Sequence, residues 1–408
     1  RYYLYIGAMS KPIPTYEKDF YSEDVIRDPY PEYELMRGLG PVVYLKKLGA
    51  YAFTHYESVK YALQNHRIFI NSNGVAADDF GSSFLKGNIL SSDPPVHSEL
   101  RKAMAPPLMP KSLKLIEIRV EEFAVKIINK LILKQDGFDV MKELAPILPL
   151  EIVRDMIGLP EFGKRNMLNW ADAAFNILGI QNSRGQDGVR KITEMRQFIE
   201  GKITRENIRK GGWIDRLFIM LENDEIKPEH VPIIIRDYTT PSLDTTISAI
   251  GHLIWHLSQN PDQWDEVRND KSKIELAISE SIRLSSPIRS FCRTTAVDIE
   301  FQSYKIPEGS KVMLLFASAN RDDRVFPEPD RFNINRLTND HLGFGYGIHM
   351  CVGKHLAILE MSKLLLAMSN QVKTIRTYNP RIYLNNTIYR FEELSARFVP
   401  INENEIDK

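Results

Sequence analysis

The sequence is poor in cysteine and has no excess of charge of either sign. Its 408 residues include two cysteines, too few for a disulfide framework, so we expect a protein of the reducing cytoplasm. Basic and acidic side chains both number 53, and this balance argues against a nucleic-acid partner, which usually requires a strongly basic face. No apolar run approaches the roughly 20 residues of a membrane span. The 43% hydrophobic content instead predicts a globular protein with a large core and no membrane partner.

Nothing obvious divides the chain, because it lacks internal repeats, low-complexity tracts and linkers rich in glycine and serine. The first residues are the exception. Gly-Ala-Met-Ser at positions 7–10 is typical of a vector junction, so we interpret residues 1–8 as a cloning remnant ahead of a native start at Met9. Residues 9–408 are predicted to form a single domain.

Helical periodicity dominates the predicted secondary structure. Apolar residues recur at helical spacing through most of residues 95–285 and again at 354–368, and one long helix is expected at 231–260. Short strands are predicted at 41–45, 51–54, 299–301 and 311–316, followed by a hairpin at 381–398. The pattern indicates a mainly α protein with small sheets.

The most informative segment is the glycine-rich run at 341–353, which contains Cys351. A thiolate can serve as the axial ligand of haem iron, but it needs shelter and N–H donors directed at its sulfur. Glycines let a loop wrap closely around the sulfur, Phe344 can shield it, and a helix that begins after the cysteine directs its amides at the anion. The pattern Phe344-x-x-Gly347-x-x-x-Cys351-x-Gly353 resembles the haem-binding signature of the cytochrome P450 family.

Three other interpretations compete for this loop. Cys351 could be a small buried hydrophobe, as a lone cysteine often is. The glycines could form a phosphate loop, although no buried strand precedes them and no acidic residue follows at the dinucleotide spacing. A catalytic Cys–His pair is disfavoured because His349 lies only two residues away.

The resemblance implies the cytochrome P450 fold, a helical domain with small antiparallel sheets and haem b (iron protoporphyrin IX) between an oxygen-activating helix and the cysteine loop. Haem propionates are anionic, and His97 and Arg101 lie at i and i+4 on one helical face, with Arg293 and His349 at further matching family positions. Cys292 lacks a glycine cradle and is expected to line a wall of the site. The implied cofactor-binding set is His97, Arg101, Arg293, Phe344, His349, Cys351 and Gly353, with Cys351 as the metal ligand.

A charged pair, Glu280 and Arg283, occurs at i and i+3 in a helical stretch, where the two side chains share a face. A surface ion pair is the ordinary interpretation of such spacing. In the family, however, this pair ties a helix to an arginine-bearing loop behind the haem. Arg331 in the run 326–332 is our candidate for the third, structural member.

The predicted long helix carries an acid–alcohol pair, Asp244-Thr245, that matches the family pair. Inserting one atom of O2 requires protons, which Asp244 could relay while Thr245 holds water and oxygen in place. Thr246 fits a threonine that bonds back to a helix carbonyl. Pro241-Ser242 departs from the small residues usual in the family, and the proline is expected to kink the helix.

Several segments, including 73–75, 174–176 and 385–387, resemble bacterial members that hydroxylate or demethylate para-substituted benzoates. The resemblance implies an aromatic ring between two phenylalanines and a carboxylate near an arginine and a threonine. Asn73 stands where that group carries an arginine, so weaker or differently oriented carboxylate binding is expected. Core packing is the competing interpretation for the aromatic side chains. The implied substrate contacts are Phe175, Leu178, Arg236, Thr240 and Phe291.

The resemblance implies a cytoplasmic haem-thiolate monooxygenase that inserts one atom of O2 into a small substrate by hydroxylation or O-demethylation. Electrons would come from NAD(P)H through ferredoxin reductase and ferredoxin, because a chain of this length holds no reductase domain. Charge complementarity suggests lysine contacts for an acidic ferredoxin, although solvated lysines are the ordinary alternative. These candidates are Lys102, Lys111, Lys114 and Lys354.

Two alternative functions remain open. A peroxygenase driven by hydrogen peroxide is disfavoured by the Asp244-Thr245 pair, which such members typically lack. A haem-thiolate protein that binds a ligand without turnover is favoured by Pro241 alone.

Overall fold

The structure is a computed structural model that describes residues 10–337 and 340–401, so the predicted remnant at 1–8 lies outside the described residues. The first helices are α1 Glu23–Arg27, α2 Tyr30–Leu39, α3 Tyr56–Gln64, α4 Asp79–Phe84, α5 Val96–Met104, α6 Pro110–Leu113, α7 Glu117–Leu131, α8 Val140–Glu143 and α9 Ile147–Ile157. They are followed by α10 Glu161–Ile177, α11 Ser183–Lys202, α12 Trp213–Glu222, α13 His230–Thr239, α14 Asp244–Gln259, α15 Pro261–Asn269, α16 Ile274–Ser285, α17 Phe316–Ala319 and α18 Lys354–Gln371.

The strands form one larger sheet and two small ones. They are β1 Thr15–Tyr16, β2 Val42–Leu45, β3 Ala50–Phe53, β4 Phe69–Ile70, β5 Phe138–Asp139, β6 Ser290–Thr295, β7 Ile299–Phe301, β8 Tyr304–Ile306, β9 Lys311–Leu315, β10 Val372–Ile382 and β11 Phe391–Pro400. The larger sheet has the order β1-β2-β3-β9-β6-β4, the second β10-β11-β5, and β7 pairs with β8.

The larger sheet is mixed rather than purely antiparallel, which corrects one detail of the expected fold. β1 runs parallel to β2, and β3 runs parallel to β9. Parallel neighbours require a long connection rather than a hairpin, and more than 250 residues, most of them helical, separate β3 from β9. Hairpin spacing alone therefore could not predict this pairing.

The predicted long helix at 231–260 is in fact two helices, α13 and α14, separated by residues 240–243. Pro241 has no N–H to donate to the carbonyl of Asp237, so the helical hydrogen-bond ladder is interrupted there. The proline therefore does more than kink the helix, because it ends one helix shortly before the next begins.

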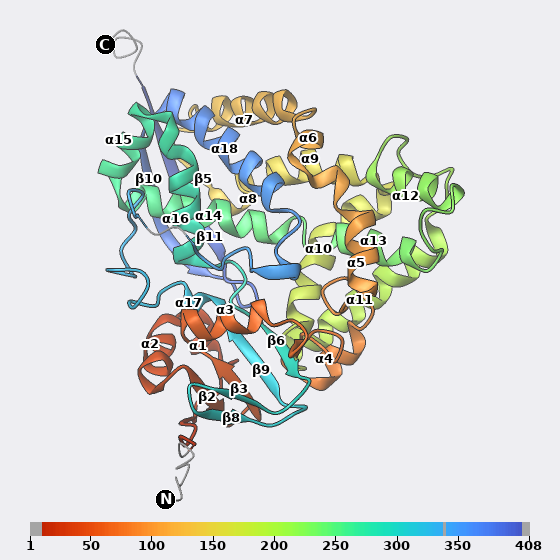
Figure 1. Ribbon diagram of the computed structural model, residues 1–408. Coiled ribbons are helices and arrows are strands. Elements are labelled where there is room, and N and C mark those ends of the chain that lie inside the picture. The colour runs from red at the N-terminus through yellow and green to blue at the C-terminus, as the bar shows by residue number, and fades with distance from the viewer. Residues whose placement is uncertain (1–9, 338–339, 402–408) are drawn as a thin grey trace, which may run out of the picture.

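The larger core lies among the helices, and α14 runs through it. Most residues of α14 are buried, as expected for a helix that is apolar on most of its sides, and it packs against α16 and β10. Figure 1 shows the sheet strands β2, β3 and β9 with α1 and α2 in the lower left half, α14 and α18 above them, and α10 to α13 at the right. No helix in residues 10–337 or 340–401 is both long and apolar enough to cross a membrane.

Candidate active site

The loop before α18 holds Cys351 in a tight backbone turn. Gly345 and Gly347 have φ angles of +70° and +72°, in the left-handed region that favours glycine. A Cβ added at Gly347 would lie 2.6 Å from the Leu63 carbonyl oxygen, so a side chain does not fit there. The Cys351 amide donates to the Phe344 carbonyl at 2.8 Å and closes the turn. Gly347 of the motif is thus required by backbone conformation and close approach, and Gly345 by backbone conformation.

Cys351 is surrounded by protein, yet it is exposed to an open cavity of about 290 Å³ that it lines. Burial raises the pKa of the Cys351 thiol, whereas the amides of Gly353 and Lys354 at the start of α18 and the charge of Arg101 lower it. A metal ion bonded to the sulfur would oppose the effect of burial, because coordination favours the thiolate. The loop therefore supplies a sheltered sulfur with N–H donors already directed at it.

Cys292, the other cysteine of the chain, is unsuited to the role of iron ligand. It is 1% exposed and packs in a hydrophobic cluster, and burial raises the pKa of its thiol to about 12. We expected it to line a wall of the site, which is wrong. Side chains alternate along a strand, so Phe291 and Arg293 of β6 face the cavity while Cys292 points the other way.

The four residues assigned to propionates, His97, Arg101, Arg293 and His349, all line this cavity. The His97 and His349 rings lie 4.2 Å apart, and among the described residues neither Nε2 atom has a hydrogen-bond partner although both are buried. In the described ranges, Arg101 and Arg293 donate only to backbone carbonyls, of Met350 at 2.6 Å and of Cys292 at 2.8 Å.

Within the part of the chain that the structure describes, the buried Nε2 atoms of His97 and His349 have no partner, and Arg101 and Arg293 are not paired with a carboxylate. The two guanidinium groups therefore leave this wall electropositive. Burial and the charges of Arg293, His97 and Arg101 lower the pKa of His349 to about 2. An anionic group would satisfy all four side chains at once, because unpaired buried donors are costly. The arrangement fits the two carboxylates of a haem whose iron faces Cys351.

Behind the cysteine loop, Glu280 and Arg283 of α16 form a buried bidentate ion pair. Arg283 Nε and Nη2 each donate to a Glu280 carboxylate oxygen at 2.8 Å, and the side chains are 0% and 1% exposed. Arg283 also donates to the carbonyls of Asn320 at 2.7 Å and Pro329 at 2.8 Å. The pair therefore anchors the segment that leads into the cysteine loop.

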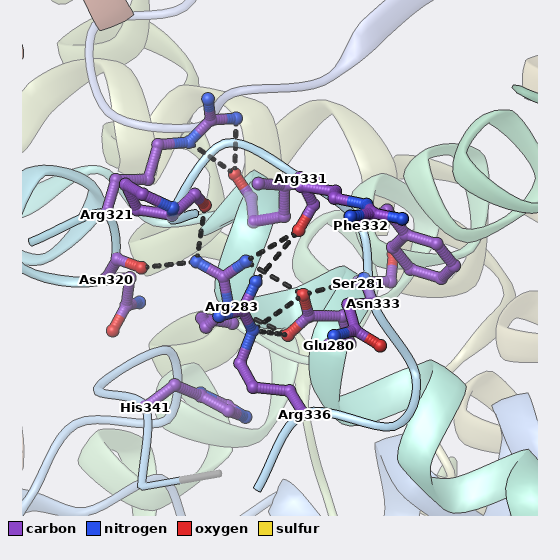
Figure 2. Close-up of polar contacts among 12 residues, drawn as sticks. Glu280, Ser281, Arg283, Asn320, Arg321, Arg331, Phe332, Asn333, Arg336 and His341 are labelled. Carbon is purple, nitrogen blue, oxygen red and sulfur yellow. Dashed lines mark hydrogen bonds and ion pairs between the residues drawn. The ribbon is translucent and has the colours of Figure 1, made fainter. Parts of the chain in front are cut away.

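The third member of this cluster is Arg336, and our assignment to Arg331 is wrong. Arg336 Nε lies 3.1 and 3.2 Å from the two Glu280 carboxylate oxygens. The Arg331 side chain is exposed, pairs with Glu328 at 3.3 Å, and contributes only its backbone carbonyl to the cluster. Figure 2 shows Arg283 and Arg336 converging on Glu280 while the Arg331 side chain points away. Both arginines follow Glu280 by about 50 residues in an irregular segment, so spacing could not distinguish them.

Side-chain hydroxyls donate hydrogen bonds to backbone carbonyls at the break between α13 and α14. Thr240 Oγ1 donates to the Arg236 carbonyl at 3.1 Å, Ser242 Oγ to the Tyr238 carbonyl, and Thr245 Oγ1 to the Pro241 carbonyl at 2.9 Å. These bonds partly replace amide bonds lost at the break. The break also places several of these polar side chains at the cavity wall, namely Thr240, Ser242, Thr245 and Thr246.

The two members of the acid–alcohol pair, Asp244 and Thr245, have different surroundings at the start of α14. Thr245 lines the cavity, whereas Asp244 is 1% exposed and forms an ion pair with Arg390 at 3.3 Å, with its Oδ2 left without a partner among the described residues. Burial raises the pKa of Asp244 to about 6, although Arg390 opposes the shift and Asp172 adds to it. The carboxyl can therefore exchange a proton near neutral pH.

Sequence reasoning missed a second buried acid at the cavity, Glu360 of α18. Its carboxyl is 1% exposed, lines the cavity, and has no partner for either oxygen in the described part of the chain. Burial raises the pKa of Glu360 to about 8, so the group holds a proton inside the site at neutral pH. The available signal was a single acid among the apolar residues of this helix.

Glu360→Gln is expected to stabilise the holoenzyme progressively as pH rises. The folded protein keeps the Glu360 proton up to a pKa of about 8, while the unfolded chain releases it near the ordinary value of 4.5, so wild-type stability falls across this window. Glutamine does not titrate, and the advantage above pH 8 should be on the order of 2–4 kcal/mol.

Urea unfolding at pH 5 and pH 9 measures this difference. Glu275→Gln, at an exposed position of α16, is the control and should change stability equally at both pH values. An equal effect of Glu360→Gln at both pH values would show that Glu360 is ionised in the folded protein.

The five predicted substrate contacts, Phe175, Leu178, Arg236, Thr240 and Phe291, also line the cavity. Phe291 makes an edge-to-face contact with Phe316, with ring centroids 5.9 Å apart. Arg236 Nε is buried without a partner among the described residues. A second arginine on this wall, Arg196 of α11, was not predicted.

Comparison with known proteins identifies the family and the fold. The cytochrome P450 family model matches residues 188–370. The chain is similar to cytochrome P450 CYP199A2 of Rhodopseudomonas palustris, with 33% identity over 95% of both chains. It is also similar to linalool 8-monooxygenase of Pseudomonas putida, with 32% identity over 84% of this chain and 85% of the relative. Cytochrome P450 CYP268A2 of Mycobacterium marinum, solved with pseudoionone, shares the fold at a TM-score of 0.81 and 22% identity, over 98% of this chain and 99% of that one.

A mainly helical fold with a thiol loop facing a cavity defines a haem-thiolate type of protein. The chain belongs to the cytochrome P450 family, and it is a monooxygenase that uses haem.

Proposed function

We propose that this cytochrome P450 oxidises a small organic acid with an apolar, uncharged body such as an aromatic ring, by hydroxylation or O-demethylation. The observation that carries the proposal is Arg236, a guanidinium without an acidic partner among the described residues in a cavity lined mostly by apolar side chains. A carboxylate is the natural counter-ion for such a group, because it can accept two parallel N–H bonds. Phe175 and Phe291 lie on the same cavity and supply flat surfaces for the apolar body.

Haem, when bound, supplies the activation of O2 and the insertion of one oxygen atom into the substrate. Cys351 would hold the iron, while His97, Arg101, Arg293 and His349 would hold the propionates. Phe344 and Gly353 border the same cavity beside the sulfur. The role of the chain is to orient the substrate, shelter the sulfur and deliver protons.

Proton delivery is assigned to Asp244 and Thr245. Asp244 exchanges protons near neutral pH behind the cavity wall, and the Thr245 hydroxyl faces the cavity while donating to the Pro241 carbonyl. When Thr245 turns its hydroxyl into the cavity, it can orient a water molecule beside the reacting oxygen. The backbone break at Pro241 leaves that carbonyl available as its resting acceptor.

Thr245→Ala is expected to lower the product formed per NAD(P)H consumed several-fold and to raise hydrogen peroxide release, because protons are no longer delivered in order. Thr193→Ala is the matched control, since Thr193 makes the same bond to a carbonyl four residues earlier on the exposed face of α11. Fully coupled turnover in Thr245→Ala would contradict the relay.

Electrons are proposed to come from NAD(P)H through ferredoxin reductase and a ferredoxin that docks on the cysteine side. Lys102 on α5, Lys111 on α6 and Lys114 just after α6 are exposed, and α6 contacts α18, the helix that follows Cys351. Lys354 is half-buried, with its Nζ 5.6 Å from the centre of the Phe344 ring, and it contributes less to such a surface. Turnover with these partners rather than with hydrogen peroxide alone distinguishes this monooxygenase from a peroxygenase.

The acid preference is tested by the spin-state shift that substrates cause in the haem spectrum. Para-methoxybenzoic acid and octanoic acid are each titrated beside the primary amide of the same body. We expect at least one acid to bind about tenfold or more tightly than its amide, since the amide keeps the shape and loses the charge. Equal affinities for acid and amide on both bodies would refute the proposal.

A further inference from the structure

Arg196 faces the same cavity as Arg236 from a different helix, α11 rather than α13. Its guanidinium lies 4.3 Å from the centre of the Phe84 ring, and its Nη2 donates to the Phe84 carbonyl. Its Nε is buried and has no hydrogen-bond partner among the described residues. Stacking on Phe84 and one hydrogen bond to its carbonyl hold the Arg196 guanidinium in place and leave its Nε able to donate to a ligand.

Arg196 and Arg236 form no ion pair with any carboxylate of the described residues. Burial lowers the pKa of Arg196, the charge of Arg236 lowers it further, and Glu200 only partly opposes this. Asp237, the nearest acid on α13, accepts the Ile89 amide at 2.8 Å, and burial raises its pKa to about 7. Asp237 also lines the cavity, and the charge of Arg236 lowers its pKa against the effect of burial. Two cations thus share a mostly apolar cavity, and neither is ion-paired with a carboxylate of the described residues, which is costly in the free enzyme.

We propose that Arg196 and Arg236 together form a two-arginine site for the acid group of the substrate, with Arg196 as a specificity-determining residue. The inference rests on the proposed function and adds a second arginine to the site. An anion placed between the two guanidiniums removes the repulsion between them and accepts hydrogen bonds from both Nε atoms. The preferred ligand is an amphipathic carboxylate whose two oxygens are both free, with its apolar body extending along Phe175 and Phe291 toward Cys351.

The test compares Arg196→Gln and Arg236→Gln holoenzymes in the same acid and amide titrations. Each substitution should weaken binding of the preferred acid by about tenfold or more and leave binding of its amide within about twofold. The double variant should weaken acid binding by less than the product of the single effects, because both arginines bind one group. Arg190→Gln, on the exposed face of α11 where Arg190 pairs with Asp187, is the matched control and should change neither affinity.

A purely structural role for Arg196 gives a different result. If Arg196 only supports Phe84, Arg196→Gln weakens acid and amide equally, and this outcome overturns the inference. Arg196→Lys keeps the charge but not the planar fork, and it should restore part of the acid preference. Thermal unfolding of each holoenzyme identifies any variant that alters the fold.

The two proposals fail in distinguishable ways. If wild type binds acids and amides equally, the proposed acid substrate is wrong and the two-arginine site fails with it. A different result refutes only the role of Arg196: wild type prefers acids, Arg236→Gln abolishes this preference, and Arg196→Gln retains it.

Discussion

Cys351→Ala is expected to abolish the red-shifted absorption band that a thiolate-bound ferrous haem shows with carbon monoxide, together with all monooxygenase activity. The reason is that Cys351 is the cysteine whose sulfur faces the cavity, with the amides of Gly353 and Lys354 directed at it. No neighbouring side chain can supply an equivalent anionic sulfur ligand. The reduced, carbon monoxide-treated spectrum of the purified variant provides the measurement.

Cys292→Ala is the matched control, since it removes the other cysteine of the chain from a buried position outside the cavity. It should retain the band and cost stability only through lost packing. If Cys351→Ala kept the band, the assignment of the iron ligand and of the cavity would both have to be abandoned.

Glu280→Ala is expected to lower the free energy of unfolding by about 3–5 kcal/mol, because it leaves the fully buried Arg283 guanidinium without its counter-charge. Arg336→Ala removes the second cation from the same carboxylate and should cost about 2–4 kcal/mol. Arg331→Ala removes an exposed side chain from an exposed pair and should cost less than about 0.5 kcal/mol.

The comparison of Arg336→Ala with Arg331→Ala decides which arginine completes the Glu280 cluster. Each variant loses one guanidinium from the same segment, so differences in net charge cancel. Urea unfolding followed by helical circular dichroism gives the stabilities, and haem retention reports on the cysteine loop. A larger loss in Arg331→Ala than in Arg336→Ala would restore the original assignment.

Much of the candidate site could be predicted because it is local in sequence. The glycines around Cys351, the Glu280–Arg283 pair and the Asp244-Thr245 pair each lie within one loop or one helical turn. Their relative positions then follow from backbone geometry alone. Pro241 was also interpretable, since the missing N–H acts on the carbonyl four residues earlier, although a kink was expected and a break is found.

Other features depend on contacts between distant segments. Arg336 rather than Arg331 meets Glu280 because of how an irregular loop folds back over α16. Arg390 reaches Asp244 across 146 residues, and the parallel pairing of β3 with β9 joins segments far apart in the chain. No periodicity encodes such partners.

By itself, the sequence determined the family, the cysteine that faces the cavity and a disturbed helix at Pro241, because each depends on residues a few positions apart. Only the tertiary structure decided which arginine completes the Glu280 cluster, that Glu360 is buried without a partner, and that Arg196 joins Arg236 in one cavity. The physical reason is that burial and charge pairing depend on which distant segments pack together, and that packing is a property of the whole fold.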